Sequence, residues 1–261
     1  MSQGPENLSF AGASGEPLAA RLERPVGPVS AYAVFAHCFT CGKNVRAASS
    51  IAKALAEEGV AVLRFDFTGL GSSEGDFANT TFSSNVADIL AAARYVEATH
   101  GPVGLLIGHS LGGAAVLCAA ARLEGVVGVA TIGAPSDERH VERLITDELE
   151  AIERDGEALV TIAGRSFRIK REFLDDLREA RVGAAVASLG CPLLVLHSPA
   201  DAVVPIACGL RIFEKAKHPK SFVSLAGADH LLSRREDATY AAQIISAWIM
   251  RILEQRATGP H

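Results

Sequence analysis

Short apolar runs alternate with helical patterns along most of the chain, and this alternation constrains the fold more than any other feature. The apolar runs are Tyr32–Ala36, Val60–Phe65, Val103–Ile107, Val126–Ile132, Pro192–Leu196 and Ser221–Leu225. Helical patterns lie at 45–58, 82–99, 113–121, 204–217 and 239–255. Apolar strands separated by amphipathic helices form a parallel sheet that helices cover on both faces. We therefore expect an α/β fold with a mostly parallel central sheet, preceded by a hairpin at 8–22.

Length and composition limit the classes of protein that fit. The 261 residues, 49% of them hydrophobic, suffice for one such domain with an insertion. A net charge of -5 gives no indication of nucleic acid or of an anionic membrane as partner. No uncharged apolar segment is long enough to span a bilayer, and no signal peptide is visible. Five cysteines in a chain without a signal predict reduced thiols and a cytoplasmic location.

The alternation is interrupted after Pro135. Residues 136–187, called the insertion below, are strongly charged and contain two helical stretches around a hairpin of Ala158–Ala163 and Ser166–Lys170. We expect the insertion to form a lid over an α/β core that comprises residues 1–135 and 188–261. The alternative is a peripheral layer that has no role at a functional site.

A serine lies where a predicted strand meets a predicted helix. Residues 108–112 read Gly-His-Ser-Leu-Gly, between the strand 103–107 and the helix 113–121. Gly-x-Ser-x-Gly in this context is typical of a nucleophile, because the turn strains the serine backbone and lifts the hydroxyl clear of the sheet. The flanking glycines are needed because a Cβ would collide with the neighbouring strand and helix. Ser110 is the predicted nucleophile, and a plain glycine-rich turn is the alternative.

Such a serine needs a base to accept its proton and an acid to orient the base. On this architecture the three residues follow the chain order serine, acid, histidine, and each lies just past a strand end. Asp201 follows the strand 192–196, and His230 follows the strand 221–225. We predict that Asp201 and His230 complete a catalytic triad with Ser110.

Other residues near these strand ends compete for the same roles. His197 precedes Asp201 on the strand of the acid itself, and Asp229 is adjacent to His230, where neighbouring side chains usually diverge. His109 lies beside the serine but is expected to point away from the hydroxyl. We interpret the remaining histidines as surface residues: His100, His140, His218 and His261.

An oxyanion formed at the substrate carbonyl needs two backbone N–H donors. One is predicted at Leu111, directly after the serine. The other is predicted at Phe39, in the loop His37–Gly42 after the strand that ends at Ala36. Four aromatic residues are candidates for the pocket wall, although aromatic side chains more often lie in a core: Phe39, Phe67, Phe167 and Phe173.

The elbow at Ser110, together with Asp201 and His230, resembles the α/β-hydrolase superfamily over nearly the whole chain. Asp66–Gly75 is similar to the glycine-rich loop of these hydrolases. Four segments look like the hydrolase found fused or adjacent to OsmC-like proteins: His37–Cys41, Arg64–Gly71, Lys220–Leu225 and Gly227–Leu232. The hairpin of the insertion is similar to the lid of feruloyl and cinnamoyl esterases. Cys38 departs from the family pattern, which has a glycine there, so the local loop conformation is expected to differ.

The resemblance implies a serine-dependent carboxylic ester hydrolase that acts through an acyl-enzyme on small to medium acyl or aryl esters. No metal and no cofactor are needed for this chemistry. The same triad would also serve thioester, amide or carbon–carbon hydrolysis. A non-enzymatic alternative is that the protein is a non-catalytic partner of an OsmC-like protein. The sequence does not decide between a homo-oligomer and a complex with an OsmC-like protein.

Two further patterns suggest other chemistry. Cys38 and Cys41 have a Cys-x-x-Cys spacing, but zinc usually needs four ligands and no second cysteine pair exists. We favour two reduced thiols, with a redox role as the alternative, in which oxidation would shift the oxyanion donor. Gly69 and Gly71 follow a strand, but Glu74 stands where a dinucleotide-binding fingerprint needs its third glycine.

Overall fold

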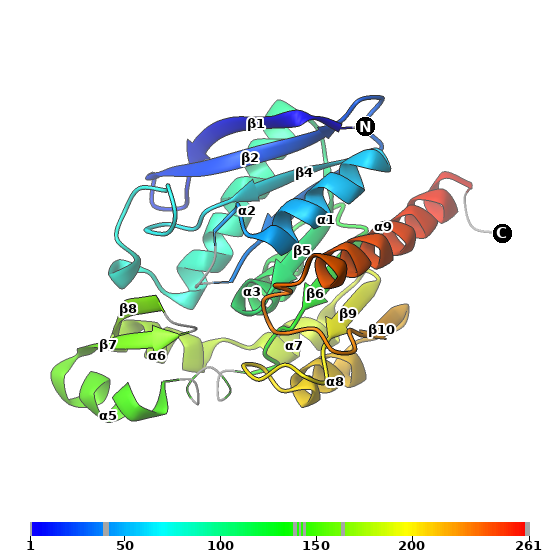
Figure 1. Ribbon diagram of the computed structural model, residues 1–261. Coiled ribbons are helices and arrows are strands. Elements are labelled where there is room, and N and C mark those ends of the chain that lie inside the picture. Colours follow the sequence, from blue (N-terminus) through cyan, green and yellow to red (C-terminus); the bar gives the residue numbers. More distant parts are fainter. Residues whose placement is uncertain are drawn as a thin grey trace.

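An eight-stranded sheet forms the centre of the computed structural model, which describes residues 2–38, 42–137, 140, 142, 145–162 and 165–258 (Figure 1). The strand order is β1-β2-β4-β3-β5-β6-β9-β10. The strands are β1 (Ser2–Ala11), β2 (Pro17–Pro25), β3 (Ala31–Ala36), β4 (Val60–Phe65), β5 (Val103–His109), β6 (Gly128–Ile132), β9 (Leu193–His197) and β10 (Lys220–Ser224).

Most of this sheet is parallel. Strands β1 and β2 pair antiparallel, as do β2 and β4, and every neighbouring pair from β4 to β10 runs parallel. The parallel strands therefore direct their carboxyl ends to one edge of the sheet, where ligands bind in this class of fold. The predicted hairpin and the predicted mostly parallel sheet are confirmed.

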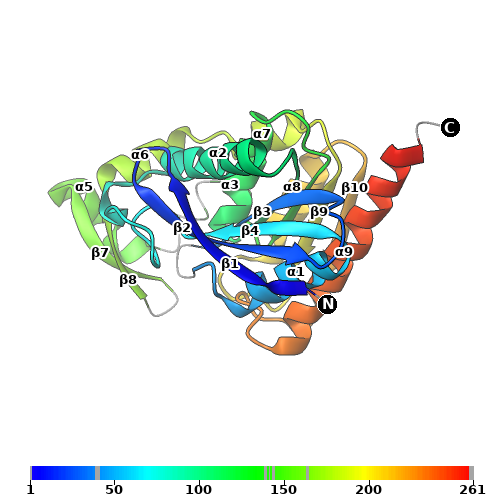
Figure 2. The same ribbon diagram turned by 90° about the horizontal axis from the view of Figure 1, so that it is seen from above.

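Helices cover both faces of the sheet (Figure 2). The helices α1 (Arg46–Glu57) and α9 (Arg235–Thr258) pack together on one face. The other face carries α2 (Phe82–Thr99), α3 (Leu111–Ala120), α7 (Val182–Ser188) and α8 (Ile206–Lys215), and a short 3-10 turn, η1 (Phe77–Asn79), precedes α2. Helix α2 has the predicted bounds, and α9 begins four residues before the predicted start, with Glu236 and Asp237 in its first turn. Acidic residues there favour a helix start because they face the positive end of the helix dipole.

Each parallel strand contributes side chains to both apolar layers. Val34 lies in the layer under α2 and α3, and its neighbour Phe35 lies in the layer under α1 and α9. In the same way, Leu106 lies in the layer under α2 and α3, and Ile107 lies in the layer under α1 and α9. All four side chains are at most 1% exposed. This two-sided burial explains why the strands read as continuous apolar runs in the sequence.

Within the insertion, α5 (Thr146–Asp155) is followed by the antiparallel pair β7 (Glu157–Ile162) and β8 (Arg165–Lys170) and then by α6 (Arg171–Glu179). The predicted hairpin is present. Two helices, α6 and α7, follow it where a single helical stretch was expected. Strand β8 packs beside η1, α6 beside α2, and α7 against α3 and α8. Buried side chains such as Ile152, Phe167 and Leu174 join the apolar layer of α2 and α3.

Candidate active site

Ser110 occupies the tight turn between β5 and α3 in a conformation that side chains rarely adopt. Its backbone angles are φ 55° and ψ -127°, outside the regions favoured by L-residues. A Cβ at Gly112 would lie 2.5 Å from the carbonyl oxygens of Ala36 and His37. The strained serine and the need for glycine beside it agree with the prediction from the sequence. The turn holds the serine at the carboxyl edge of the sheet.

The structure brings the three residues of the predicted triad together. His230 Nε2 lies 3.0 Å from Ser110 Oγ, and His230 Nδ1 lies 2.7 Å from Asp201 Oδ2. Asp201 belongs to the loop between β9 and α8, and His230 to the loop between β10 and α9. Three loops far apart in the chain thus meet at one edge because their strands are close neighbours in the sheet. The chain of contacts can move a proton from the hydroxyl to the imidazole.

Asp201 is held as a carboxylate facing the imidazole. Its Oδ1 accepts hydrogen bonds from the backbone N–H groups of Val203 at 2.9 Å and Val204 at 2.8 Å. Burial opposes ionisation, but the hydrogen bond and charge of His230 and these two N–H donors outweigh it. The pKa of Asp201 therefore lies below its ordinary value of 3.8. The group remains negative at any pH near neutrality.

The competing residues have other partners. Asp229 accepts a hydrogen bond from the backbone N–H of Ser233 at 2.8 Å, so its carboxyl does not orient the imidazole. His109 donates to the backbone carbonyl of His230 at 2.7 Å. His197 donates to the carbonyl of Val204 at 2.8 Å. Neither His109 nor His197 replaces His230 as the partner of the serine.

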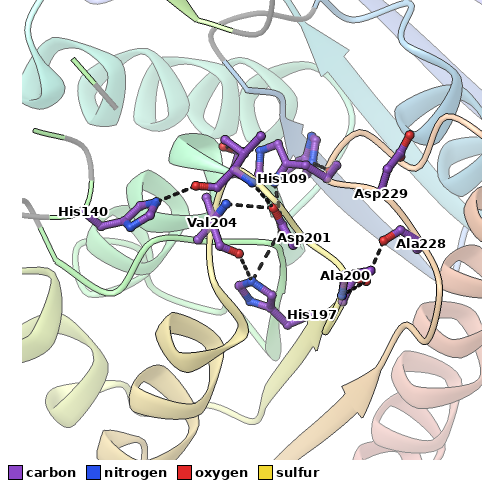
Figure 3. Close-up of polar contacts among 12 residues, drawn as sticks. His109, His140, His197, Ala200, Asp201, Val204, Ala228 and Asp229 are labelled. Atoms are coloured by element: carbon purple, nitrogen blue, oxygen red, sulfur yellow. Dashed lines mark hydrogen bonds and ion pairs between the residues drawn. The ribbon is translucent and has the colours of Figure 1, made fainter. Parts of the chain in front are cut away.

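The surface prediction fails for one histidine. His140 is buried, with 7% of its surface exposed, and its Nε2 donates to the carbonyl of Val203 at 3.0 Å (Figure 3). The partner is a backbone carbonyl of the loop that carries Asp201, and such a contact leaves no pattern in the sequence around the histidine. His218 is exposed as predicted, His100 is half-buried, and His261 lies outside the described residues.

One of the two predicted oxyanion donors, Leu111, lies among the described residues. Leu111 is the first residue of α3, and the first N–H groups of a helix have no acceptor within the helix itself. Its N–H is therefore available at the positive end of the helix dipole, next to Ser110. Phe39, the second predicted donor, lies outside the described residues and stays a prediction.

A buried ionic network, not predicted from the sequence, joins residues that follow β3 to residues at the end of β4 and after it. Asp66 Oδ1 accepts from the Lys43 backbone N–H at 2.5 Å, and Oδ2 accepts from Lys43 Nζ at 2.5 Å and from Ser72 N–H at 2.9 Å. Arg64 donates to the carbonyl of Lys43 at 2.5 Å. One carboxylate therefore joins the chain after β3 to the glycine-rich loop after β4. The sequence shows Asp66 as the start of that loop but does not show its partner.

Replacing Asp66 by asparagine is expected to lower the free energy of unfolding by about 3 kcal/mol at pH 7, because it leaves the Lys43 ammonium buried without a counter-charge. Burial raises the pKa of Asp66, but its hydrogen bonds outweigh burial and set it below its usual value. The carboxylate therefore stabilises the fold fully above the unfolded pKa of about 4, and this stabilisation is lost as the pH falls through the folded value.

Urea denaturation of the native protein and of Asp66→Asn at pH 7 and pH 3 measures this effect, because pH 3 lies below the unfolded pKa. The difference between the two proteins should shrink at the lower pH. Adding Lys43→Met to Asp66→Asn should recover part of the loss, because it removes the unpaired charge. An equal difference at both pH values would contradict this role of the ion pair.

The expectation that both cysteines of the Cys-x-x-Cys pattern are reduced is wrong for Cys38, which is disulfide-bonded and 3% exposed. Oxidation depends on which sulfur atoms come within bonding distance after folding, and counting cysteines does not determine this. Cys41 lies outside the described residues. Three other cysteines are free: Cys118, Cys191 and Cys208. The disulfide coexists with the assembled contacts of Ser110, and Cys38 does not support the predicted reducing compartment.

An open cavity of about 390 Å³ lies between the glycine-rich loop and β8 of the insertion. Its apolar lining includes Leu70, Phe77 and Phe167. The rings of Phe77 and Phe167 meet edge to face, with centroids 5.5 Å apart. Phe67 and Phe173, also predicted for the pocket wall, are at most 3% exposed and pack in the core.

Two kinds of feature are absent from the part of the chain that the structure describes. No helix in the described ranges has the length and apolar character that crossing a bilayer requires. In the same part of the chain, no three His, Cys, Asp or Glu side chains gather in a group that could hold a metal ion.

Comparison with known proteins identifies the family. A model of the alpha/beta hydrolase family matches residues 33–243. The chain belongs to the alpha/beta hydrolase family. Among solved structures, this member of the family is similar to the esterase domain of a Rhodothermus marinus protein, at 47% identity and a TM-score of 0.81. That match covers 95% of this chain and 99% of the other.

Two more distant relatives differ in what their names state. Est1E from Butyrivibrio proteoclasticus, solved with ferulic acid bound, is 22% identical with a TM-score of 0.77, covering 94% of this chain and 99% of that one. At this identity the likeness concerns the fold alone. Mouse palmitoyl-protein thioesterase ABHD10 is 30% identical over 188 residues, which are 69% of this chain but only 62% of the mouse protein.

Proposed function

We propose that this member of the alpha/beta hydrolase family hydrolyses carboxylic esters through an acyl-enzyme on Ser110. The observation that carries the proposal is the position of the His230 imidazole, 3.0 Å from Ser110 Oγ and 2.7 Å from Asp201 Oδ2. A serine hydroxyl becomes a nucleophile at neutral pH when an adjacent base can accept its proton. The strained turn at Ser110 is the second support, because it presents the hydroxyl at the sheet edge.

The reaction follows from these contacts in two halves. His230 Nε2 takes the hydroxyl proton as Ser110 Oγ attacks the ester carbonyl, and the N–H of Leu111 binds the oxyanion that forms. The C–O bond of the ester breaks, the leaving alcohol receives the proton from His230, and an acyl-serine remains. Water then attacks the acyl-serine with His230 as base, which releases the acid and restores the serine.

Asp201 has two effects in this cycle. Its hydrogen bond to Nδ1 fixes the tautomer in which Nε2 of His230 is free to accept a proton. Its negative charge stabilises the imidazolium that forms during each half-reaction. The low pKa of Asp201 keeps that charge present throughout the working range of pH.

The proposal also specifies the kind of bond that is cleaved, an oxygen ester and not a thioester. The 47% identical structure is named an esterase domain and supports carboxylic esters, with small to medium acyl or aryl groups as the expected acids. The 30% identical mouse relative is named a thioesterase, so thioesters are the alternative substrates. A link to OsmC-like proteins and the formation of a homo-oligomer stay predictions.

A substrate panel tests the proposal. Oxygen esters, thioesters and anilides of the same acyl group, from acetyl to octanoyl and feruloyl, are compared by initial rates. We expect kcat/KM for the oxygen ester to exceed that for the thioester at least tenfold. A thioester preference of that size would establish the alternative. No turnover of any compound, together with no labelling by a fluorophosphonate, would contradict an enzymatic function and favour a non-catalytic partner.

A further inference from the structure

Two buried histidines lie at strand ends on either side of the Asp201–His230 pair. His109 is the last residue of β5 and is 1% exposed, and His197 is the last residue of β9 and is fully buried. His109 Nε2 lies 2.7 Å from the backbone carbonyl oxygen of His230. His197 Nε2 lies 2.8 Å from the backbone carbonyl oxygen of Val204, in the loop of the acid (Figure 3). Each ring thus contacts a loop that carries one residue of the triad.

The partners determine the protonation of both rings. A carbonyl oxygen only accepts hydrogen bonds, so Nε2 carries the proton in each ring. Burial lowers the pKa of His109 to about 3 and lowers that of His197 as well, so neither ring gains a second proton near neutral pH. Both rings are therefore neutral donors. Their Nδ1 atoms are buried and have no hydrogen-bond partner among the described residues.

A buried histidine at either position lowers the stability of the fold relative to an apolar side chain of similar size. A buried acceptor without a partner destabilises the fold, and an apolar side chain of similar size would avoid this cost. The donor contact at Nε2 is what an apolar side chain would lose. The polar ring therefore favours a function of that contact over packing alone.

The carbonyl contacts bear directly on the geometry of the triad. His109 holds the peptide of His230 itself and so limits where the imidazole can lie. Val204 is held from two directions, because its carbonyl accepts from His197 while its N–H donates to Asp201 Oδ1 at 2.8 Å. His197 Nε2 is itself 3.7 Å from Asp201 Oδ2. β5 and β9 are fully buried strands inside the sheet, so each histidine connects its loop to a strand that is packed on both faces.

The charge of the His109 ring affects the proposed reaction as well as its position. The rings of His109 and His230 have centroids 5.1 Å apart. During the proposed reaction His230 becomes an imidazolium, and a second positive ring at this distance would oppose that step. A neutral His109 donates its hydrogen bond without this repulsion.

We propose that His109 and His197 are positioning residues: neutral imidazoles that fix the backbone carbonyls of the base loop and the acid loop and thereby keep His230 Nε2 within reach of Ser110 Oγ. The inference rests on the proposed function of Ser110 and His230. It assigns to two histidines outside the triad a role that leucine cannot fill and that glutamine can, because the amide of glutamine presents an N–H near the position of Nε2.

Four variants test the donor role: His109→Leu, His109→Gln, His197→Leu and His197→Gln. Rates are divided by the number of active sites, titrated with a fluorophosphonate, so that lost folding is not counted as lost activity. We expect kcat per site to fall about 10- to 100-fold in the leucine variants, with KM changed less than threefold, because small displacements in a site cost rates of this size. The glutamine variants should stay within about threefold of the native enzyme.

His100 supplies the matched control. It is half-buried and stacks on Tyr32 near the amino end of β3, so it lies at the opposite edge of the sheet. His100→Leu should leave kcat per site unchanged. Equal losses in the leucine and glutamine variants, or native kcat per site in both leucine variants, would overturn the proposal.

A measurement on the native protein does not depend on the variants folding. Nitrogen-15 NMR of the histidine rings, with the glutamine variants used for assignment, should show both rings as neutral Nε2–H tautomers from pH 7 to 9, and His109 should stay neutral down to pH 5. Titration of His109 above pH 5 or of His197 above pH 7, or the Nδ1–H tautomer of either ring, would overturn the inference. This readout needs no activity, so a failure of the proposed function, seen as native rates in Ser110→Ala, is recognised separately.

Discussion

Asp201→Asn is expected to lower kcat by about four orders of magnitude at pH 7 while the protein stays folded. The N–H groups of Val203 and Val204 both donate to Oδ1, so they select the carbonyl oxygen of an asparagine for that position. Its NH2 group must then face His230 Nδ1, which becomes the acceptor. The proton of the imidazole moves to Nε2, and that nitrogen can no longer take the proton of Ser110.

Asp229→Asn is the matched control for this variant. Asp229 lies next to the base in the chain, but its carboxyl accepts from the N–H of Ser233, which an amide oxygen accepts equally well. Its kcat should stay within about twofold of native. The dependence of kcat on pH adds a second check. Because the pKa of Asp201 is lowered, titration of this carboxyl should not reduce kcat of the native enzyme at any pH above 5. Native kcat in Asp201→Asn, or an equal loss in Asp229→Asn, would contradict the assignment.

Ser110→Ala is expected to lower kcat by a factor of at least about 10⁴, because it removes the nucleophile and leaves only binding and oxyanion contacts. Alanine has the same Cβ as serine, so the strained backbone at φ 55° is unchanged and the fold should be retained. Circular dichroism and thermal melting check the fold, and rates on the preferred ester check the loss.

Ser136→Ala serves as the comparison, because the Ser136 hydroxyl donates to Asp137 and not to the triad. It should keep native kcat. Ser110→Ala with the native fold and more than about 1% of the native kcat would mean that another group performs the attack.

The fold and the contacts among Ser110, Asp201 and His230 could be predicted because the sequence carries local patterns for both. Continuous apolar strands follow from burial on two faces, as at Val34 and Phe35. The turn at Ser110 needs glycine at fixed positions, which a sequence displays directly. Asp201 and His230 could be placed because strand ends of a parallel sheet meet at one edge, so chain order alone limits the candidates.

The supporting contacts could not be predicted in the same way. His109, His140 and His197 each donate to a backbone carbonyl, and any residue provides such a carbonyl, so no residue type indicates the partner. His140 was expected at the surface for this reason and is buried. The pairing of Lys43 with Asp66 also depends on how two loops approach each other after folding.

The site of covalent labelling tests directly whether Ser110 is the nucleophile. The native protein is treated with a fluorophosphonate, digested and analysed by mass spectrometry, with Ser110→Ala treated in parallel. We expect one adduct per chain, on the peptide that contains Ser110, and none in the variant. An adduct on another residue, or no adduct in a folded protein that hydrolyses esters, would contradict this expectation.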